Sequence, residues 1–342
     1  MKLPFSSGVV VCFAAMAALA CGSASAQNDR PGPLIFGVVS DIHCESGNLK
    51  AQAKFRNALR DARGLGARVL VVAGDIADGQ ARDYRKVHSI TDASPMAGSV
   101  YFAMGNHEYY GAFHDQSGAW NPAFFPNNQT DQAAKERFNS FRGVAPKSPV
   151  YYDEWIGGFH FIFLAGEFSR MTQDGYKDDA VLSPEQLSWL KASLEKTRPD
   201  EPVFVFLHQP FPGTVAGSYD GAASIKQSGE LNSLLAAHPA AIMFSGHSHR
   251  ALAMPGTFYT DASRKFAMFN CSSVWQPCGA DDKPLEVDAS EGFIVYAGED
   301  GVVVRGRDFK NAKFMENQTY NIRSGPDNNP RKSRTAPVPA DD

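Results

Sequence analysis

The sequence predicts a layered α/β fold, and three observations support this prediction. Short apolar runs rich in Val, Ile and Phe recur along the chain, as expected for strands that are covered on both faces. Segments in which apolar residues have helical spacing stand between several of these runs. Five of the runs are followed directly by polar residues of the kinds that bind metal ions. Strands that alternate with helices build a sheet flanked by helices.

Five apolar runs are the predicted core strands. They are LIFGVVS (34–40), ARVLVVA (67–73), SVYFAM (99–104), PVFVFL (202–207) and AAIMFS (240–245). Beyond residue 265 the chain reads as strands alone, at 265–274, 291–299 and 301–309. We expect these last three strands to complete a second sheet that packs against the first.

Three helices are predicted between the strands. The first, 48–66, has apolar residues at helical spacing and stops at glycines, and the third covers 229–239. The second, 183–198, begins with Ser183 as its expected N-cap and with Pro184 at the first helical position.

The two ends of the chain are expected to lie outside this domain. Residues 1–26 have the layout of a secretory signal peptide, because an apolar stretch precedes the small residues Ala-Ser-Ala, and residues 27–33 read as a linker. The expected protein is therefore exported, either periplasmic or secreted, with lipid anchoring at Cys21 as the alternative. The domain is expected at 34–322, and the Pro- and Asn-rich stretch 323–342 is expected to be a disordered tail.

Charge and cysteine content limit the function further. The formal charge of −4 becomes one unit more negative once Lys2 leaves with the signal peptide. A mildly acidic chain is not expected to bind nucleic acid stably, since such proteins usually carry a basic excess. No run after the signal peptide is long and apolar enough to span a membrane. In an oxidising compartment, Cys271 and Cys278 either form a disulfide or remain free, and Cys44 would be unpaired.

Polar residues follow each of the five core strands. In chain order they are Asp41 and His43; Asp75 and Asp78; Asn106, His107 and Glu108; His208; and His247 and His249. Ligands collect at this edge of open α/β sheets, so we expect these side chains to converge. Asp, Asn and His are ligands for divalent ions such as Zn²⁺, Mn²⁺ and Fe. We further expect Asp-x-His and His-x-His to direct both side chains to one side of an extended backbone.

In this order the motifs resemble those of the calcineurin-like metallophosphoesterases. That family has Asp-x-His, Gly-Asp-x-x-Asp/Gly, Gly-Asn-His-Asp/Glu, a lone His and Gly-His-x-His, and all five are present between residues 41 and 249. The resemblance extends over about 34–310. It implies a four-layer αββα sandwich of two mixed sheets flanked by helices, with a dinuclear metal site at the C-terminal edge of the strands.

The resemblance also implies roles for the matched residues. One ion would be held by Asp41, His43, Asp75 and His249, and the other by Asp75, Asn106, His208 and His247. Asp75 would bridge two divalent ions, which could be Mn, Fe or Zn. A metal-bridging hydroxide would be the nucleophile, His107 the general acid, and Asp78 the residue that orients His107. The alternative for Asp78 is a capping carboxylate on the following helix.

The expected function is the metal-dependent hydrolysis of small phosphate esters, with nucleotides among the candidate substrates. We favour a phosphodiesterase over a phosphomonoesterase or nucleotidase, and the remaining alternative is a non-catalytic metal-binding scaffold. Asn106, His114 and Tyr109 are the candidate substrate contacts. For His114 the alternative is a solvated loop residue, and for Tyr109 it is packing in the core.

Overall fold

The computed structural model describes the chain from residue 33 to residue 322 with several gaps. The described ranges are 33–115, 117–121, 131–169, 178–219, 221–286, 288–298 and 301–322. The expected signal peptide, Cys21 and the expected tail therefore lie outside the described residues. No helix among the described residues is long and apolar enough to cross a membrane.

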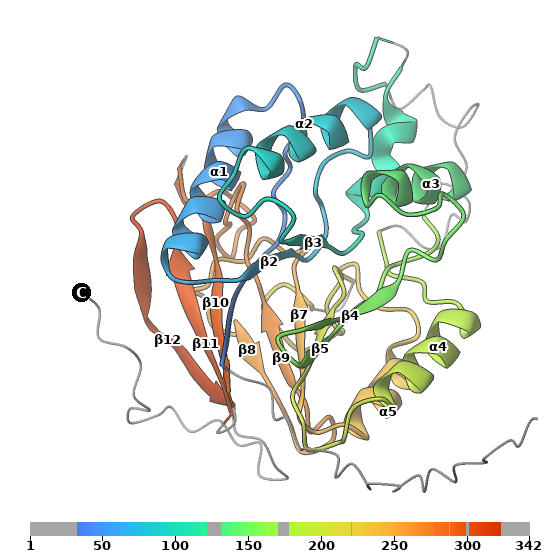
Figure 1. Cartoon of the computed structure of the whole chain (residues 1–342), viewed down its shortest axis with the longest axis vertical. Coiled ribbons are helices and arrows are strands. Elements are labelled where there is room, and N and C mark those ends of the chain that lie inside the picture. The colour runs from blue at the N-terminus through green and yellow to red at the C-terminus, as the bar shows by residue number, and fades with distance from the viewer. Residues whose placement is uncertain are drawn as a thin grey trace, which may run out of the picture. The chain divides into compact units, whose positions relative to one another are not determined.

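The first sheet contains six strands in the order β12-β11-β10-β1-β2-β3 (Figure 1). Their bounds are β1 Leu34–Val39, β2 Val69–Val72, β3 Val100–Phe102, β10 Glu291–Gly298, β11 Gly301–Asp308 and β12 Lys313–Ile322. The strands β1, β2 and β3 run parallel, whereas β10 pairs antiparallel with the free edge of β1 and continues into β11 and β12. The sheet is therefore mixed.

The second sheet also has six strands, in the order β4-β5-β6-β7-β9-β8. Their bounds are β4 Tyr152–Ile156, β5 Phe159–Phe163, β6 Val203–Phe206, β7 Ala241–Ser245, β8 Phe258–Tyr259 and β9 Ala267–Asn270. The prediction that all three late runs build this sheet is wrong. Only β9 joins it, because β10 and β11 extend the first sheet along β1.

Helices cover the outer face of each sheet, so the described domain has the four layers expected. The helices are α1 Leu49–Gly64, α2 Ala81–Asp92, α3 Asp131–Phe141, α4 Pro184–Leu194 and α5 Ser228–Ala236, with a short 3₁₀ helix, η1, at His107–Phe113. Figure 1 shows α1 and α2 on one side of the strands and α4 and α5 on the other. The Ser183 hydroxyl accepts a hydrogen bond of 3.1 Å from the Gln186 amide, which confirms it as the N-cap of α4.

Three apolar clusters fill the spaces between the layers. The middle cluster lies between the two sheets and includes Phe36, Phe204, Phe244 and Phe293, each fully buried. The rings of Phe36 and Phe204 meet edge to face at 4.8 Å. The outer clusters join α1, α2 and α3 to the first sheet and α4 and α5 to the second. This packing fixes the positions of the strand ends that carry the polar motifs.

The three cysteines of the described domain are free and buried. Cys271 and Cys278 therefore form no disulfide in this structure. Cys44 belongs to the apolar cluster beneath α1, where burial raises the pKa of its thiol to about 12. A thiol in this state is a packing residue and not a nucleophile.

Candidate functional site

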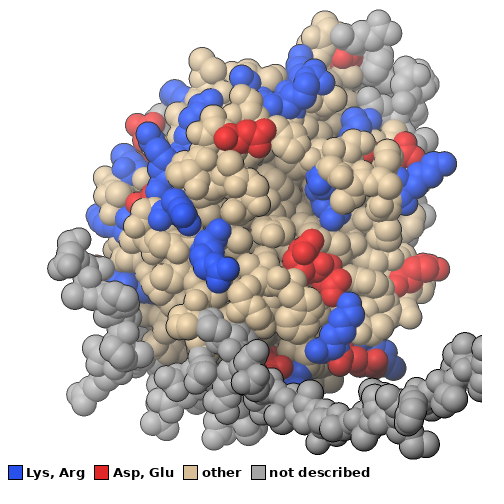
Figure 2. Space-filling view, in the orientation of Figure 1, with Lys and Arg blue, Asp and Glu red and all other residues tan. Residues whose placement is uncertain are grey.

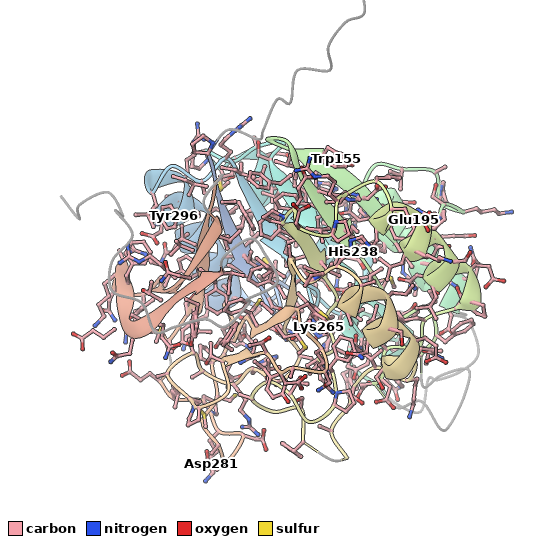
Figure 3. The ribbon with its side chains drawn as sticks, turned by 90° about the horizontal axis from the view of Figure 1, so that it is seen from below. Trp155, Glu195, His238, Lys265, Asp281 and Tyr296 are labelled. Atoms are coloured by element: carbon pink, nitrogen blue, oxygen red, sulfur yellow. The ribbon has the colours of Figure 1, made fainter. Side chains whose placement is uncertain are left out.

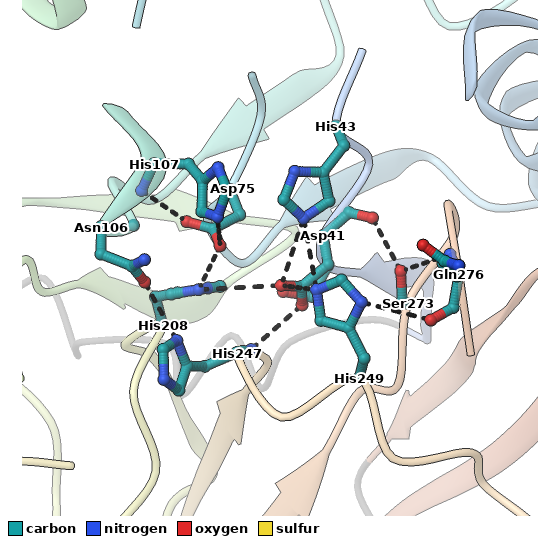
Figure 4. A network of polar contacts seen from close by, with 12 residues as sticks. Asp41, His43, Asp75, Asn106, His107, His208, His247, His249, Ser273 and Gln276 are labelled. Atoms are coloured by element: carbon teal, nitrogen blue, oxygen red, sulfur yellow. Dashed lines mark hydrogen bonds and ion pairs between the residues drawn. The ribbon is translucent and has the colours of Figure 1, made fainter. Parts of the chain in front are cut away.

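The polar residues that follow five strands come together in one cluster (Figure 4). Three of these strands, β1, β2 and β3, belong to the first sheet, and the other two, β6 and β7, belong to the second. The cluster therefore lies where corresponding ends of both sheets meet. Residues more than 200 positions apart touch here, since His43 Nε2 lies 3.2 Å from His249 Nε2.

The backbone beneath the cluster is not extended, which corrects the expectation based on strand alternation. β1 ends at Val39 and β7 at Ser245, before the motif residues begin. Five motif residues instead have positive φ, between 39° and 68°: Asp41, His43, Asp75, His247 and His249. Non-glycine residues rarely adopt this region, which costs on the order of 1–3 kcal/mol each and concentrates at functional sites.

One group of ligand-type atoms is formed by Asp41, His43 and His249. Asp41 Oδ1 lies 3.0 Å from His249 Nε2 and 3.9 Å from His43 Nε2. The Asp41 carboxylate is fully buried, and its Oδ2 accepts a hydrogen bond of 3.1 Å from the His247 amide. Oδ1 therefore remains directed toward the imidazoles.

A second group is formed by Asp75, His208 and His247. Asp75 Oδ2 lies 3.0 Å from His208 Nε2, while its Oδ1 accepts a hydrogen bond of 3.0 Å from the His107 amide. Asn106 completes this group, because its Oδ1 lies 3.0 Å from His247 Nδ1. A further overlapping triplet joins Asp75 to His43 and His107, so Asp75 lies between the two groups.

Backbone carbonyls determine which nitrogen of two imidazoles faces the cluster. His208 Nδ1 lies 2.8 Å from the Ala73 carbonyl oxygen, and His249 Nδ1 lies 3.2 Å from that of Gln276. A carbonyl can only accept, so each Nδ1 carries the proton and donates it. Nε2 is therefore the nitrogen that faces the carboxylates, and its lone pair is available to a cation when the ring is neutral. This is the arrangement typical of histidine ligands to metals.

The donor set fits divalent cations. Asp41 Oδ1 and His208 Nε2 are both buried and have no hydrogen bond within the described residues. His208 Nε2 is close to Asp75 Oδ2, but the two atoms do not form a hydrogen bond. Buried polar atoms are normally hydrogen-bonded, so atoms left in this way point to a missing partner. Nitrogen and oxygen donors around shared carboxylates suit Mn, Fe or Zn.

The charged groups of the cluster shift one another's pKa values. Burial opposes the charge of Asp41, but His249 and His208 outweigh this effect and lower the pKa of Asp41 to about 2. Burial, together with the charge on His208, lowers the pKa of His247 to about 4. Burial also opposes the charge on His107, yet Asp75 and Asp78 raise the pKa of His107 to about 9. The carboxylates are therefore ionised, as ligands must be.

Asp78 supports His107 from outside the cluster. Its Oδ1 lies 2.8 Å from His107 Nδ1, and its Oδ2 lies 3.1 Å from His114 Nε2. The helix-cap alternative for Asp78 is not what the structure shows, because α2 begins after Gln80 without a side-chain cap. His107 Nε2 points back toward the cluster, 3.8 Å from Asp75 Oδ2.

Glu108 holds two of the motif loops together. Its fully buried carboxylate lies within hydrogen-bond distance of four backbone amides, which belong to Asp75, Ile76, Ala77 and Gly105. The shortest of these bonds, from Gly105, is 2.6 Å. This carboxylate therefore positions the loops that carry Asp75 and Asn106.

The candidate substrate contacts lie in different surroundings. Tyr109 is only 2% exposed, and its hydroxyl donates to the Gly166 carbonyl, so it packs in the core as in the alternative reading. Both ring nitrogens of His114 have partners, because Nε2 lies 3.1 Å from Asp78 Oδ2 and Nδ1 lies 3.1 Å from the Gly118 carbonyl oxygen. Asn106 is placed in the cluster itself.

Sequence reasoning missed the residues that support the cluster from behind. Tyr110 lies within 3.3 Å of the Asn106 amide nitrogen and 2.7 Å of Asp178 Oδ1, which directs the Asn106 oxygen toward His247. Ser273 donates to the Asp41 carbonyl at 2.9 Å. No motif surrounds Asp178 or Ser273 in the sequence, so only the folded chain identifies them.

Gly246 illustrates how tightly the strand ends approach each other. A Cβ atom at this position would overlap with Ser40 Oγ and Asp41 Oδ2. The glycine thus allows β7 to end directly against the loop after β1.

Comparisons with known proteins agree with this geometry. A family model described as calcineurin-like phosphoesterase matches residues 34–251. No curated protein matches the sequence significantly. Among solved structures, the chain is similar to a dimetal phosphatase from Danio rerio, with 17% identity and a TM-score of 0.58 over 87% of this chain and 100% of that one.

Two further structures share the fold. A purple acid phosphatase from yellow lupin seeds is 12% identical with a TM-score of 0.54, over 86% of this chain and 54% of that one. GAP50, the anchor in the inner membrane complex of Plasmodium, is 12% identical with a TM-score of 0.51, over 86% of this chain and 90% of that one. At these identities the likeness is one of fold.

Proposed function

This chain belongs to the calcineurin-like phosphoesterase family, and we propose that, within the metal-dependent phosphoester hydrolases, it is a phosphodiesterase that acts on small phosphate esters. The coarser function follows from the family and from the cluster of Asp and His side chains. The preference for diesters rests on the charges around the cluster.

Two groups of residues would hold the cations. Asp41, His43 and His249 would bind one, His208, His247 and Asn106 would bind the other, and Asp75 would be shared between them. When bound, two divalent cations supply Lewis-acid polarisation of the phosphoryl group and activation of water. The fixed Nδ1 protons of His208 and His249 keep the ligand nitrogens oriented before the ions bind.

His107 is the proposed proton donor to the leaving group. Asp78 accepts a hydrogen bond from Nδ1–H of His107, and this bond directs Nε2 toward the cluster. Burial lowers the pKa of His107, but the charges of Asp75 and Asp78 have the larger effect and raise it to about 9. Nε2 therefore carries a proton near neutral pH. The Nε2 proton can then pass to the oxygen of the departing alcohol.

The charge around the cluster supports a diester substrate. Asp41, Asp75 and Asp78 form ion pairs with histidines, and no Lys or Arg of the described chain lies within 4.0 Å of their oxygens. A phosphate monoester carries up to two negative charges and a diester carries one. A site whose positive charge comes from its cations and histidines alone is better matched to the smaller charge.

The test compares bis(p-nitrophenyl) phosphate with p-nitrophenyl phosphate as substrates. The purified protein is stripped of metals by chelation, and turnover is measured after Mn²⁺, Zn²⁺ or Fe²⁺ is returned. We expect metal-dependent turnover with a larger kcat/KM for the diester. A larger kcat/KM for the monoester would reject the diesterase proposal, and no turnover of either with metal bound would favour the scaffold alternative.

We also propose that the protein is exported. The support is the sequence layout of residues 1–26, which lie outside the described part of the chain. Mass spectrometry of the protein recovered from its native host should give an N-terminus at Gln27. An intact Met1, or a lipid on Cys21, would contradict this cleavage.

A further inference from the structure

A second polar cavity lies between the N-terminal half of α1 and the segments next to β10 and β11. It has a volume of about 180 Å³ and is lined by residues that include Lys50, Lys54, Asn57, Asp288, Ser290 and Lys310. None of these residues belongs to the metal-type cluster. In Figure 2, basic side chains gather over the side of the domain where α1 lies.

Lys54 is a buried ammonium group in the wall of this cavity. The residue is 7% exposed, and its Nζ donates to the carbonyl oxygens of Trp275 and Ala289 at 2.5 Å and 2.8 Å. Within the described chain, no carboxylate oxygen forms an ion pair with this nitrogen. Lys54 Nζ also lies over the Trp275 ring, 4.9 Å from its centroid. Lysine has three N–H donors, and two carbonyls are the hydrogen-bond acceptors found for them among the described residues. A buried charge without a counter-ion is costly and favours an anion nearby.

Ser290 provides a second, independent sign of a missing partner. This residue is 2% exposed and lines the cavity, yet its Oγ has no hydrogen-bond partner among the described residues. A buried hydroxyl without a hydrogen-bond partner is unfavourable, because it has lost its hydrogen bonds to water. The hydroxyl can donate its proton to an oxygen atom of a bound group.

The charge balance of the cavity is positive. Three lysines line it against one acidic residue, Asp288. Lys310 also pairs with the exposed Glu286 at 2.7 Å, which offsets part of its charge. Burial, followed by the neighbouring Lys50 and Lys310, lowers the pKa of Lys54, whereas Asp288 raises it. The positive charge of the cavity therefore rests on the three lysines that line it.

From the cavity, the buried Lys54 ammonium group without a carboxylate partner and the Ser290 hydroxyl without a hydrogen-bond partner among the described residues, we infer a binding site for a small oxyanion of the phosphate type. The ligand is either free phosphate or the phosphoryl group of a small organic phosphate. Lys54 and Ser290 donate hydrogen bonds to its oxygens, and Lys50 and Lys310 supply longer-range attraction. The inference does not depend on the proposed function.

The site also adjoins the metal-type cluster through one residue. Lys54 Nζ donates to the Trp275 carbonyl, and the Trp275 amide donates to the Asp41 carbonyl at 3.1 Å. A bound anion would thus rest against the segment that supports Asp41 from behind.

Isothermal titration calorimetry on the full, metal-stripped protein tests the inference. Inorganic phosphate and glycerol 3-phosphate are titrated separately at constant ionic strength, with chloride as the reference anion. We expect one saturable phosphate site per chain, and whichever compound binds more tightly identifies the source of the phosphoryl group. Failure of both to saturate would overturn the inference. Because no metal is present and no turnover is measured, the result is independent of the hydrolase activity.

Two variants locate the bound anion. Ser290→Ala should weaken phosphate binding about tenfold, as for loss of a hydrogen bond to a charged group, while its melting temperature stays unchanged because the hydroxyl has no protein partner. Lys54→Met should abolish binding, with circular dichroism checking its fold. Lys283→Gln is the control, since this exposed lysine pairs with Asp281 at the outer end of the loop between β9 and β10 (Figure 3).

The Ser290→Ala variant can also show that the anion does not bind in this cavity. If phosphate binds Ser290→Ala and the wild type equally well, the anion lies elsewhere, for example among the imidazoles of the metal-free cluster. Equal weakening by Lys283→Gln would show that the binding is non-specific attraction to surface charge.

Discussion

His107 and Asp78 are joined by a hydrogen bond of 2.8 Å between Nδ1 and Oδ1, and the other oxygen of Asp78 lies 3.1 Å from His114. The imidazole is thereby fixed with Nε2 toward the cluster. His107 contributes its backbone amide to Asp75 but is not needed as a ligand in either main group. Its side chain is therefore available for proton transfer.

Replacing His107 by Ala should slow turnover and leave the metals in place. For loss of a proton-transfer residue, kcat should fall by roughly 10²–10⁴-fold. Steady-state kinetics give the rate, and elemental analysis gives the metal content. Loss of metal in parallel with activity would instead identify His107 as a ligand, as its membership of the triplet with His43 and Asp75 allows.

Asp75→Asn should remove bound metal. The substitution keeps the shape of the side chain but takes away the negative charge that lies between the two groups of donors. We expect a metal content well below that of the wild type after dialysis, together with loss of activity. Asp281→Asn, at an exposed loop position, should change neither quantity. Full metal content and activity in Asp75→Asn would refute the shared-ligand assignment.

Glu108→Gln should destabilise the fold. One oxygen of Glu108 becomes an NH₂ group, which can no longer accept from the amides bound to that oxygen. Each buried amide left without an acceptor costs about 1–3 kcal/mol in free energy of unfolding. Urea denaturation measures this loss. Glu201 is a half-buried residue that pairs with Arg198 at the surface, and Glu201→Gln should stay within about 0.5 kcal/mol of the wild type.

Gly246→Ala should weaken the site, because the added methyl group would overlap with Ser40 Oγ and Asp41 Oδ2. Displacement of Asp41 should lower the affinity for the cation held with His249, which metal titration followed by activity will show. Gly229→Ala is the matched control, since nothing lies within 4 Å of its added carbon and it is in a helix. An unchanged metal affinity in Gly246→Ala would mean that the loops separate at little cost.

Most of the buried strands could be predicted from the sequence, whereas the fully buried β5 and several more exposed elements were missed. The five apolar runs correspond to β1, β2, β3, β6 and β7, and the three predicted helices correspond to α1, α4 and α5. The missed strand β4, YDEWI, lies at a sheet edge and is largely exposed, so its composition is mixed. The helix α2 was also missed. It begins without a side-chain cap, and its many charged residues make its apolar face difficult to recognise in the sequence.

The identity of the clustered residues was likewise predictable, whereas their geometry was not. Order and position after strands were enough to select Asp41, Asp75 and His249 as neighbours. Their positive φ angles were not predicted, because this conformation is uncommon for any non-glycine residue, although Asp and His adopt it more often than most. The supporting contacts of Tyr110 with Asp178 and of Ser273 with Asp41 depend on the folded chain, since each joins residues that are far apart in the sequence.

The donors of the cluster are divided between the two sheets, and this division limits how the protein can evolve. The loops after β1, β2 and β3 carry Asp41, His43, Asp75 and Asn106, and those after β6 and β7 carry His208, His247 and His249. Neither half of the sandwich carries all the donors proposed for the two cations, so both sheets are needed to form the site. Recombination between relatives should preserve the site only when the two sheets pack at the same spacing, because that spacing sets the distances between the donors.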